Sequence, residues 1–483
     1  METLQRTANR GSISTGYDID NSCKFEADNS EVMTHTYDSA PTSQKKMTIS
    51  MWYKRTEVGS NIGLIEFGND ASGDYFQIRW GRDVYGSLET YGMRFGSTNF
   101  SVGNTYGAVR DTSAWYHIVV AIDTTQGTAA NRFKVYRNGA ELGWSTDNRA
   151  TITQNQDLAL GENGKRVVIG EGAYRYCGYI AEVNYIDGQQ LTSTDFGEYD
   201  GDSGIWIPKA YTGTYGNNGF YLDYKNSGNL GEDQSGNNHD FTLTNIASSD
   251  QATDTPTNNF CTLALQVRAG TSSEIAPIRE GGTYMPVDGT NQFLNYFGTI
   301  GVTQGKWYWE VYVPSRSASY GLLDYIGLHS MKTIPVGAAA TGGTSQCNYV
   351  LHYGDYNATV NGTNSGQNTA AGLPSYGTDG AGKTFGVAFN ADDGEITFYA
   401  NNTRIGNAGI DIFDLHDDMA AGTFVLPFFQ VYDNDLYVNF GGCSFWASPS
   451  DYDETDANGY GSFAYAPPSG YYALCTKNLA EYG

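Results

Sequence analysis

Long apolar runs, helical periodicity and clustered basic residues are all missing from this 483-residue sequence. A transmembrane helix needs about 20 consecutive apolar residues, so we expect no membrane insertion. The 28 Lys and Arg residues are scattered among 53 Asp and Glu, and the net charge is −25. Contacts to phosphate need clustered Lys and Arg, so we also expect no nucleic-acid partner. The N-terminal stretch METLQRTANRGSISTG lacks the apolar region of a signal peptide, which predicts synthesis in a cytoplasm without a secretion signal.

Cysteine is scarce, and its spacing excludes the usual zinc motifs. The six cysteines include no CxxC pair, and none lies within four residues of another. An even number permits disulfides, but domains of this size do not need them for stability. Buried thiols are therefore the favoured interpretation.

Turn-forming and strand-forming residues are abundant instead. The chain has 60 Gly for turns, and 37 Tyr and 22 Phe for strands, but only 12 Pro. Short alternating runs such as MTISMWYKR, WYHIVVAID and GYIAEVNYIDG are separated by Gly- and Asn-rich turns. This pattern predicts an all-β protein made of two consecutive antiparallel β-sandwich, or jelly-roll, domains.

Composition also suggests where the domains begin and end. Residues 1–19 are polar and are predicted to form an N-terminal arm, and residues 20–225 the first jelly roll. A stretch rich in turn residues and without periodicity, 226–260, is predicted to be a linker. Residues 261–483 then form the second sandwich.

One hairpin pattern occurs in both halves of the chain. GVAFNADDGEITFYANNTRIG, residues 386–406, alternates Val387 and Phe389 with smaller residues before a turn, and Ile396 and Phe398 after it. HIVVAIDTTQGTAANRFKVYRNGAEL, residues 117–142, has the same order of elements. In a sandwich the alternating residues face the core, so we interpret the pattern as a structural unit that recurs because there are two sandwiches.

These stretches resemble known families. MTISMWYKR, WYHIVVAID, RFKVYRNGAEL and YIAEVNYIDGQQLT resemble a laminin-G-like, concanavalin-type jelly roll. GKWYWEVYV, IGLHS, KTFGVAFNADDGEITFYANNTRIG, LPFFQVYDNDLYVNFGG and YAPPSGYYALCTKNL resemble a SPRY domain. The combination is similar to tail-fibre-like structural proteins of marine bacteriophages.

The resemblance implies a virion protein without enzymatic activity. It would be a tail fibre or appendage that contacts other virion proteins and a host cell-surface glycan or protein, and a homotrimer would be usual for a fibre. Two alternatives stay open: a capsid decoration or head fibre protein, and a polysaccharide-degrading tailspike. The nearest carboxylate pattern for the last is Glu198, Asp200 and Asp202 in a Gly-rich turn, and we expect no catalytic residues there.

Aromatic side chains are the candidates for ligand contact, because they offer a flat apolar face and a polar edge. In the first domain they are Trp80, Tyr85, Tyr91, Trp144, Tyr174 and Tyr176, and in the second Tyr349, Tyr353, Tyr356, Tyr376 and Tyr432. Trp307 and Trp309 alternate within one strand and are interpreted as core.

Calcium is the one cofactor that the resemblance suggests, since such jelly rolls often hold Ca²⁺ through loop oxygens. Two stretches cluster oxygen ligands, GEDQSGNNHD at 231–240 and DYDETDANG at 451–459. Counted from its first Asp, neither stretch has the Gly of an EF-hand loop at the sixth position, and hydrated turns are the simpler explanation.

Overall fold

The computed structural model describes residues 16–56, 62–69, 74–82, 89–95, 100–107, 109, 111–158, 160–170, 175–268, 278–286, 294–314, 325–330, 349–352, 357–360, 382–411, 421–431, 434–443 and 452–483. These residues form two compact units that meet in sequence at Thr257 and Asn258. Both are built from antiparallel sheets, so the predicted all-β class is confirmed. No helix among these residues has the length and apolarity needed to cross a membrane.

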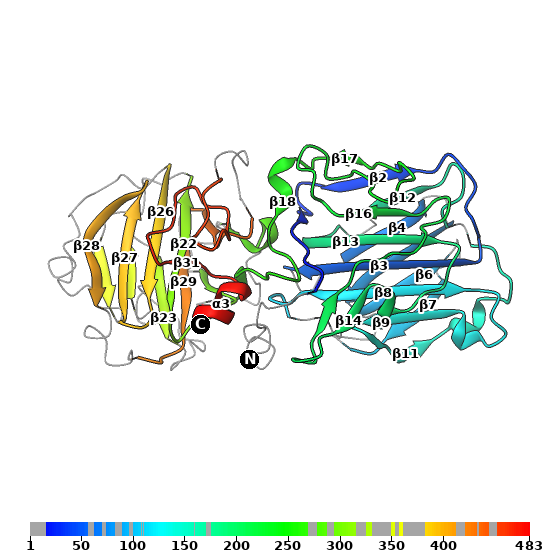
Figure 1. The fold of residues 1–483 in the computed structure, drawn as a ribbon, viewed down its shortest axis with the longest axis horizontal. Helices are drawn as coiled ribbons and strands as arrows, with labels where there is room; N and C mark the ends of the chain where they lie inside the picture. The colour runs from blue at the N-terminus through cyan, green and yellow to red at the C-terminus, as the bar shows by residue number, and fades with distance from the viewer. Residues whose placement is uncertain are drawn as a thin grey trace. The chain divides into compact units, whose positions relative to one another are not determined.

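The jelly-roll unit, Ile13–Thr257, contains two large sheets (Figure 1). The described strands of the first sheet are, in spatial order, β10 (Ala140–Glu141), β9 (Phe133–Arg137), β8 (Tyr116–Asp123), β3 (Lys46–Arg55), β13 (Gly178–Asp187), β1 (Ser22–Phe25) and β18 (Gln251–Ala252), with β16 (Phe220–Leu222) also paired to β13. Those of the second are β11 (Trp144–Asp147), β7 (Phe100–Thr105), β6 (Glu89–Phe95), β5 (Asp74–Arg82), β4 (Ile62–Asn69), β12 (Arg166–Ile169), β2 (Val32–Thr36) and β17 (Thr242–Thr244). A small hairpin, β14 (Gly197–Tyr199) with β15 (Trp206–Pro208), is separate from both. Short 3₁₀ turns are η2 (Ala129–Asn131), η3 (Arg149–Thr151), η4 (Ser193–Asp195) and η5 (Ser248–Asp250).

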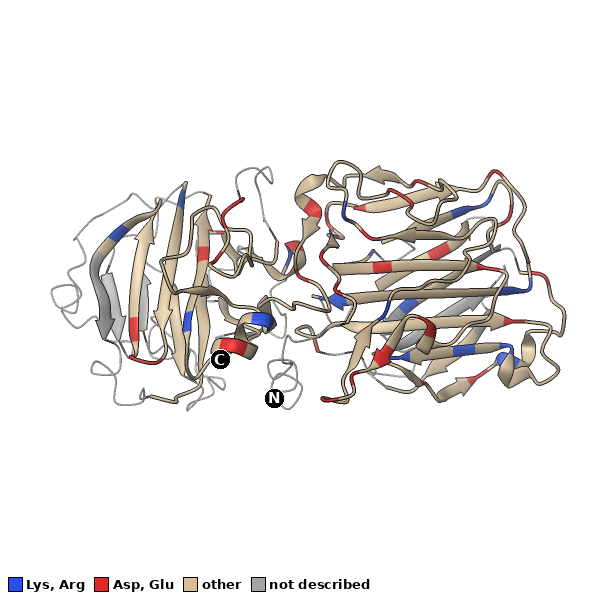
Figure 2. Cartoon of the chain, in the orientation of Figure 1, with Lys and Arg blue, Asp and Glu red and all other residues tan. Residues whose placement is uncertain are grey.

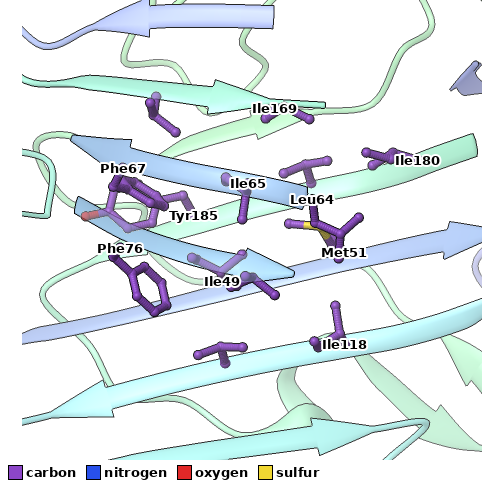
Figure 3. Packing of buried hydrophobic residues seen from close by; sticks show 14 of the residues in the cluster. Ile49, Met51, Leu64, Ile65, Phe67, Phe76, Ile118, Ile169, Ile180 and Tyr185 are labelled. Atoms are coloured by element: carbon purple, nitrogen blue, oxygen red, sulfur yellow. The ribbon is translucent and has the colours of Figure 1, made fainter. Parts of the chain in front are cut away.

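The core of this unit lies between the inner faces of the two sheets. Figure 3 shows Ile49 and Met51 of β3 and Ile118 of β8 packed with Phe67 of β4 and Phe76 of β5. All five side chains are buried. Because side chains alternate along a strand, the residues between them lie on the outer faces.

The C-terminal unit, which includes Asn258–Gly483, is a second sandwich. The described strands of one sheet are β19 (Leu263–Arg268), β21 (Leu294–Gly298), β29 (Val425–Val431), β23 (Tyr325–Ser330), β24 (Tyr349–His352) and β25 (Asn357–Val360). Those of the other are β20 (Tyr284–Met285), β30 (Leu436–Asn439), β22 (Lys306–Val313), β26 (Lys383–Asn390), β27 (Glu395–Ala400) and β28 (Thr403–Asp411), with β31 (Tyr472–Ala473) paired parallel to β22. The unit also holds η6 (Glu280–Gly282) and a C-terminal helix, α3 (Thr476–Tyr482).

The repeated hairpin is a core element, as its pattern predicts. In β26 and β27, Val387 lies opposite Phe398 and Phe389 opposite Ile396, and all four are buried. In the jelly-roll unit, β8 and β9 form the matching hairpin. Trp307 and Trp309 of β22 are likewise buried in the core.

The segment predicted as a linker is part of the jelly-roll unit up to Thr257. Within it, β17 pairs with β2 and β18 pairs with β1. Two buried ion pairs fix it to the first sheet, Lys24 with Asp250 at 3.2 Å and Lys54 with Asp254 at 2.7 Å. The sequence looks like a linker because it has turn residues and no alternation, but Leu230, Phe241 and Ile246 also anchor it in the core of the unit.

The end of the predicted arm also belongs to this unit. Ile19 is buried, and its backbone N–H donates to the Thr257 hydroxyl at 3.1 Å. Residues 1–15 lie outside the described part of the chain. The five cysteines among the described residues are buried thiols, which agrees with the favoured interpretation of the sequence.

Candidate functional site

A third layer of chain covers the outer face of the first sheet. In Figure 1, β14 and the chain around it pass in front of β8 and β9. Phe196, next to β14, packs against Val119 and Ala121 of β8, and the Trp206 ring of β15 lies 5.9 Å from that of His117. Val119 and Ala121 alternate with core residues and therefore lie on the outer face. This layer, residues 189–219, carries most of the aromatic side chains discussed below, and it leads into β16, a strand of the sheet itself that carries Tyr221.

His117 and Ser50 meet beneath the layer in a pair that resembles a nucleophile and its base. The His117 Nε2 atom lies 2.8 Å from the Ser50 hydroxyl oxygen, and both residues are buried. The Trp206 indole N–H donates to His117 Nδ1 at 3.0 Å. Because indole can only donate, Nδ1 is the unprotonated nitrogen of the neutral ring, and Nε2–H donates to Ser50.

This tautomer is opposite to the one that activates a serine. A catalytic His accepts the serine proton at Nε2 and is oriented by a carboxylate at Nδ1. Here burial also lowers the pKa of His117 to about 3, so its ring stays neutral. We therefore interpret Ser50, His117 and Trp206 as a structural stack, with Trp52 on the other face of the His117 ring at 4.7 Å.

A row of tyrosines follows along the same layer. The rings of Tyr211 and Tyr215 lie 5.3 Å apart, and those of Tyr215 and Tyr221 lie 6.2 Å apart at an angle of only 14°. The Tyr221 hydroxyl lies 3.0 Å from that of Tyr17, which comes from the N-terminal segment. We call Tyr211, Tyr215, Tyr221 and Tyr17 the tyrosine row. Each ring is half-buried, so it is held in place but keeps contact with solvent.

The row ends at Glu182, in the middle of β13. The Tyr17 hydroxyl donates to its Oε1 at 3.1 Å, and the Tyr221 hydroxyl lies 2.9 and 3.0 Å from its two oxygens. Glu182 is only 7% exposed. Burial is the largest effect on its pKa and raises it to about 7, while the hydrogen bonds from Tyr221 and Tyr17 oppose that shift.

A β-bulge directs Glu182 outward. Between Ala181 and Asn184, β13 advances three residues while β3 advances two, from Trp52 to Ser50. Glu182 takes a left-handed φ of 52° there, a conformation that is costly for a residue other than Gly. Bulges of this kind re-aim a side chain and are over-represented next to functional sites. The Tyr215 hydroxyl secures the bulge by donating to Asn184 Oδ1 at 2.9 Å.

Sequence reasoning missed this site. Glu182 appears in the strand pattern GYIAEVNYIDG, which gives no sign of a bulge. A usable signal was the density of tyrosine in YTGTYGNNGFYLDY, residues 211–224, which contains Tyr211, Tyr215, Tyr221 and Tyr224. The contribution of Tyr17 depends on a contact across 204 residues and could not be inferred from spacing.

Two of the predicted ligand-contacting aromatics are positioned by packing. Tyr176 is fully buried, and its hydroxyl donates to the backbone carbonyls of Lys54 and Tyr179, so it is a core residue and cannot reach a ligand. Trp144 is half-buried against Phe133 at 5.9 Å, with the Arg149 guanidinium 4.9 Å from its ring. Trp144 therefore packs against its neighbours on an edge strand, β11.

Two other candidates lie on neighbouring strands, because Trp80 in β5 is the register partner of Tyr91 in β6. A further candidate, Tyr349 of β24, is in the C-terminal unit, where its register partners are Leu328 and Val360. The remaining candidates lie outside the described residues: Tyr85, Tyr174, Tyr353, Tyr356, Tyr376 and Tyr432.

The acidic candidates are turn residues. Asp200 accepts hydrogen bonds from the backbone N–H groups of Asp202 and Ser203, which is turn chemistry. In the two stretches considered for calcium, Asp233 accepts from the N–H groups of Tyr221 and His239, and Asp456 from those of Ala473 and Tyr460. Among the described residues, no group of three or more His, Cys, Asp or Glu is arranged to hold a metal ion.

In the C-terminal unit, the carboxylate of Glu310 in β22 is buried in a way comparable with that of Glu182. It accepts from the N–H groups of Ala464 and Tyr465, both at 2.9 Å, and from the Tyr308 hydroxyl at 3.1 Å. Burial raises its pKa to about 7. Because its donors are mostly backbone groups of the C-terminal loop, Glu310 anchors that loop to the sheet.

Comparison with known proteins agrees with this architecture. Residues 27–195 match the model of the concanavalin A-like lectin/glucanases superfamily. The first unit therefore has a concanavalin-like jelly-roll fold of the lectin type. No curated protein matches the chain significantly.

Solved structures similar to parts of the chain include a pentraxin, a SPRY domain and a CBM40 module. A heptameric pentraxin from Limulus polyphemus is 17% identical, covering 37% of this chain and 81% of its own, with a TM-score of 0.28. The SPRY domain of human HERC1 is 16% identical, covering 34% and 94%, with a TM-score of 0.22. The CBM40 module of Ruminococcus gnavus IT-sialidase, bound to α2,3-sialyllactose, is 18% identical, covering 34% and 85%, with a TM-score of 0.22.

Proposed function

We propose that this protein is a non-enzymatic glycan-binding component of a bacteriophage virion, and that the tyrosine row with Glu182 holds the sugar. The observation that carries the binding site is the placement of half-buried tyrosine rings beside a carboxylate on a rigid sheet. Sugar rings pack their C–H faces on aromatic rings, while their hydroxyls donate to acceptors at the ring edge. The lectin-type fold of the first unit supports this assignment.

The row is suited to an extended chain of sugars. The Tyr211 and Tyr215 rings lie 5.3 Å apart at 80°, and those of Tyr215 and Tyr221 lie 6.2 Å apart at 14°, so successive sugars would meet rings of different orientation. Phe196 stacks on Tyr211 at 5.1 Å and fixes the end of the row that is distant from Glu182. Since the rings are already ordered by these contacts, little conformational entropy is lost on binding.

Binding of the purified full-length chain to a microarray of neutral and acidic oligosaccharides tests the site, followed by calorimetry on the best ligand. We expect Tyr215→Ala to weaken binding about tenfold, equivalent to about 1.4 kcal/mol. Tyr215→Phe keeps the ring but loses the hydrogen bond to Asn184, so it should weaken binding less than Tyr215→Ala does. Tyr106→Ala is the matched control, since Tyr106 is 60% exposed and outside the row.

Two results would contradict the binding proposal: no glycan retained by the wild type, or equal losses in Tyr215→Ala and Tyr106→Ala. Release of reducing sugar from a bound polysaccharide would overturn the non-enzymatic part alone.

The virion assignment rests on the resemblance of the two-domain order to tail-fibre-like phage proteins. Gold-labelled antibody against the purified chain should decorate the tail or an appendage of phage particles, and the free protein should compete with phage adsorption to host cells. Label confined to heads would favour a decoration protein instead, and particles without label would contradict a virion role.

A further inference from the structure

Glu182 has more hydrogen-bond capacity than its protein neighbours use. An ionised carboxylate has about four lone-pair positions and can only accept. Among the described residues, the donors that reach its carboxylate are the Tyr17 and Tyr221 hydroxyls, and each phenol supplies at most one proton. These donors fill about two of the four lone-pair positions, and a ligand that moves the half-buried Tyr17 or Tyr221 ring aside could supply the others. A buried carboxylate with unused positions is unfavourable, so added donors gain more here than at the surface.

The surroundings of Glu182 are acidic. Asp223 lies close enough for its charge to act on Glu182, Tyr17 and Tyr224. Among the described residues, Lys225 is a cation whose charge acts on the carboxylate, but it is exposed and lies 3.6 Å from Asp20. Along β13 itself, Figure 2 shows acidic residues and no basic one. An anionic group at this end of the row would therefore meet like charge in a partly desolvated place, where screening is weak.

We propose that Glu182 makes the site selective for neutral, hydroxyl-rich glycans, with two neighbouring sugar hydroxyls donating to its carboxylate, and that it rejects uronic or sialic acid residues at the same position. The inference rests on the proposed glycan-binding function and names its ligand class. Sugar diols supply the two missing donors from one rigid ring, so both bonds form at the entropic cost of ordering a single group. Rejection of the acidic sugar follows from the repulsion it would meet from Glu182 and Asp223.

The bulge of β13 makes the carboxylate a fixed feature. The Asn184 side-chain amide donates to the Glu182 carbonyl at 3.2 Å, and its oxygen accepts from Tyr215. The element that aims Glu182 is thus tied to the tyrosine row itself. Asn184 thus fixes the position of the Tyr215 ring relative to the Glu182 carboxylate. A site that recognises one face of a sugar needs such a fixed arrangement.

The test uses pairs of oligosaccharides that differ only at C6: a panel of neutral chains and the same chains with the hydroxymethyl group oxidised to a carboxylate. Measured at pH 8, where Glu182 is mostly ionised, affinities for the full-length wild type should favour the neutral member at least tenfold. Glu182→Gln should bind the neutral member about tenfold more weakly and reduce the preference to below threefold. Asp223→Asn should keep neutral binding and lower the preference only in part, and it serves as a second variant if Glu182→Gln does not fold.

Three outcomes would overturn the inference. Equal or tighter binding of the oxidised member by the wild type would refute the selectivity while leaving glycan binding intact. An unchanged preference in both folded variants would remove the role of these carboxylates. Failure to bind any member, neutral or acidic, would overturn the proposed function as well, so the two failures are distinguishable.

Discussion

The ammonium group of Lys54 lies 2.7 Å from the carboxylate of Asp254, and both side chains are almost completely removed from solvent. The pair joins β3 to a segment 200 residues later in the chain. The Trp115 indole N–H also donates to Asp254, at 2.8 Å. This one carboxylate therefore holds the end of the jelly-roll unit against its first sheet.

Asp254→Ala should strongly destabilise the jelly-roll unit. Removing one partner of a buried ion pair leaves an uncompensated charge, which typically costs about 3–5 kcal/mol. Asp20→Ala is the control, because the Asp20–Lys225 pair is exposed and such pairs contribute about 0–1 kcal/mol. Calorimetric melting of the full chain checks this. Similar Tm values for the two variants would show that Lys54 finds solvent or another partner.

Tyr176→Phe should lower stability without changing glycan binding. Its hydroxyl bridges two buried carbonyls, of Lys54 and Tyr179, and a lost hydrogen bond of this kind costs about 1 kcal/mol. A denaturant midpoint and an affinity measured on the same preparation separate the two effects. A large loss of affinity with unchanged stability would restore Tyr176 as a ligand contact.

Glu182 should give the jelly-roll unit a stability that falls as pH rises. Its pKa is raised from 4.5 to about 7, so the folded state prefers the protonated form. Protonated Glu182 therefore adds to the free energy of unfolding. This stabilisation is fully present below about pH 4.5 and is lost as pH rises through 7, on the order of 3 kcal/mol in total.

The comparison that checks this is the free energy of unfolding of wild type and Glu182→Gln between pH 5 and 8. The variant should become more stable relative to the wild type as pH rises. Parallel pH profiles would mean that the carboxylate ionises with a normal pKa. Glu310, whose pKa is also raised to about 7, contributes equally to both proteins and cancels in the difference.

His117 should stay neutral across the physiological range, with its proton on Nε2. Nitrogen chemical shifts of protein labelled only in its six histidines report both properties. We expect no titration of His117 above pH 5, because burial lowers its pKa to about 3. Ser50 should in turn not react with a fluorophosphonate probe. A labelled Ser50, or an Nδ1–H tautomer, would reopen a catalytic role for the pair.

Alternation and turn chemistry in the sequence determined the fold class, the paired hairpins and much of the core. Val387, Phe389, Ile396 and Phe398 follow period two, and a period-two strand in a sandwich has only one way to bury its apolar face. Trp307 and Trp309 were assigned to the core for the same reason. These features depend on neighbours in the chain, which a sequence displays directly.

Only the tertiary structure decided the functional geometry. Tyr176 and the members of the tyrosine row are the same residue type, but the Tyr176 hydroxyl donates to buried backbone carbonyls, while each ring of the row is half-buried. The contacts of Tyr17 and the Lys54–Asp254 pair join residues 165 to 204 positions apart, and the bulge at Glu182 depends on the pairing of β13 with β3. Polar contacts over such separations leave no periodicity in the sequence, because each is a single pairing that exists only once both sheets are assembled.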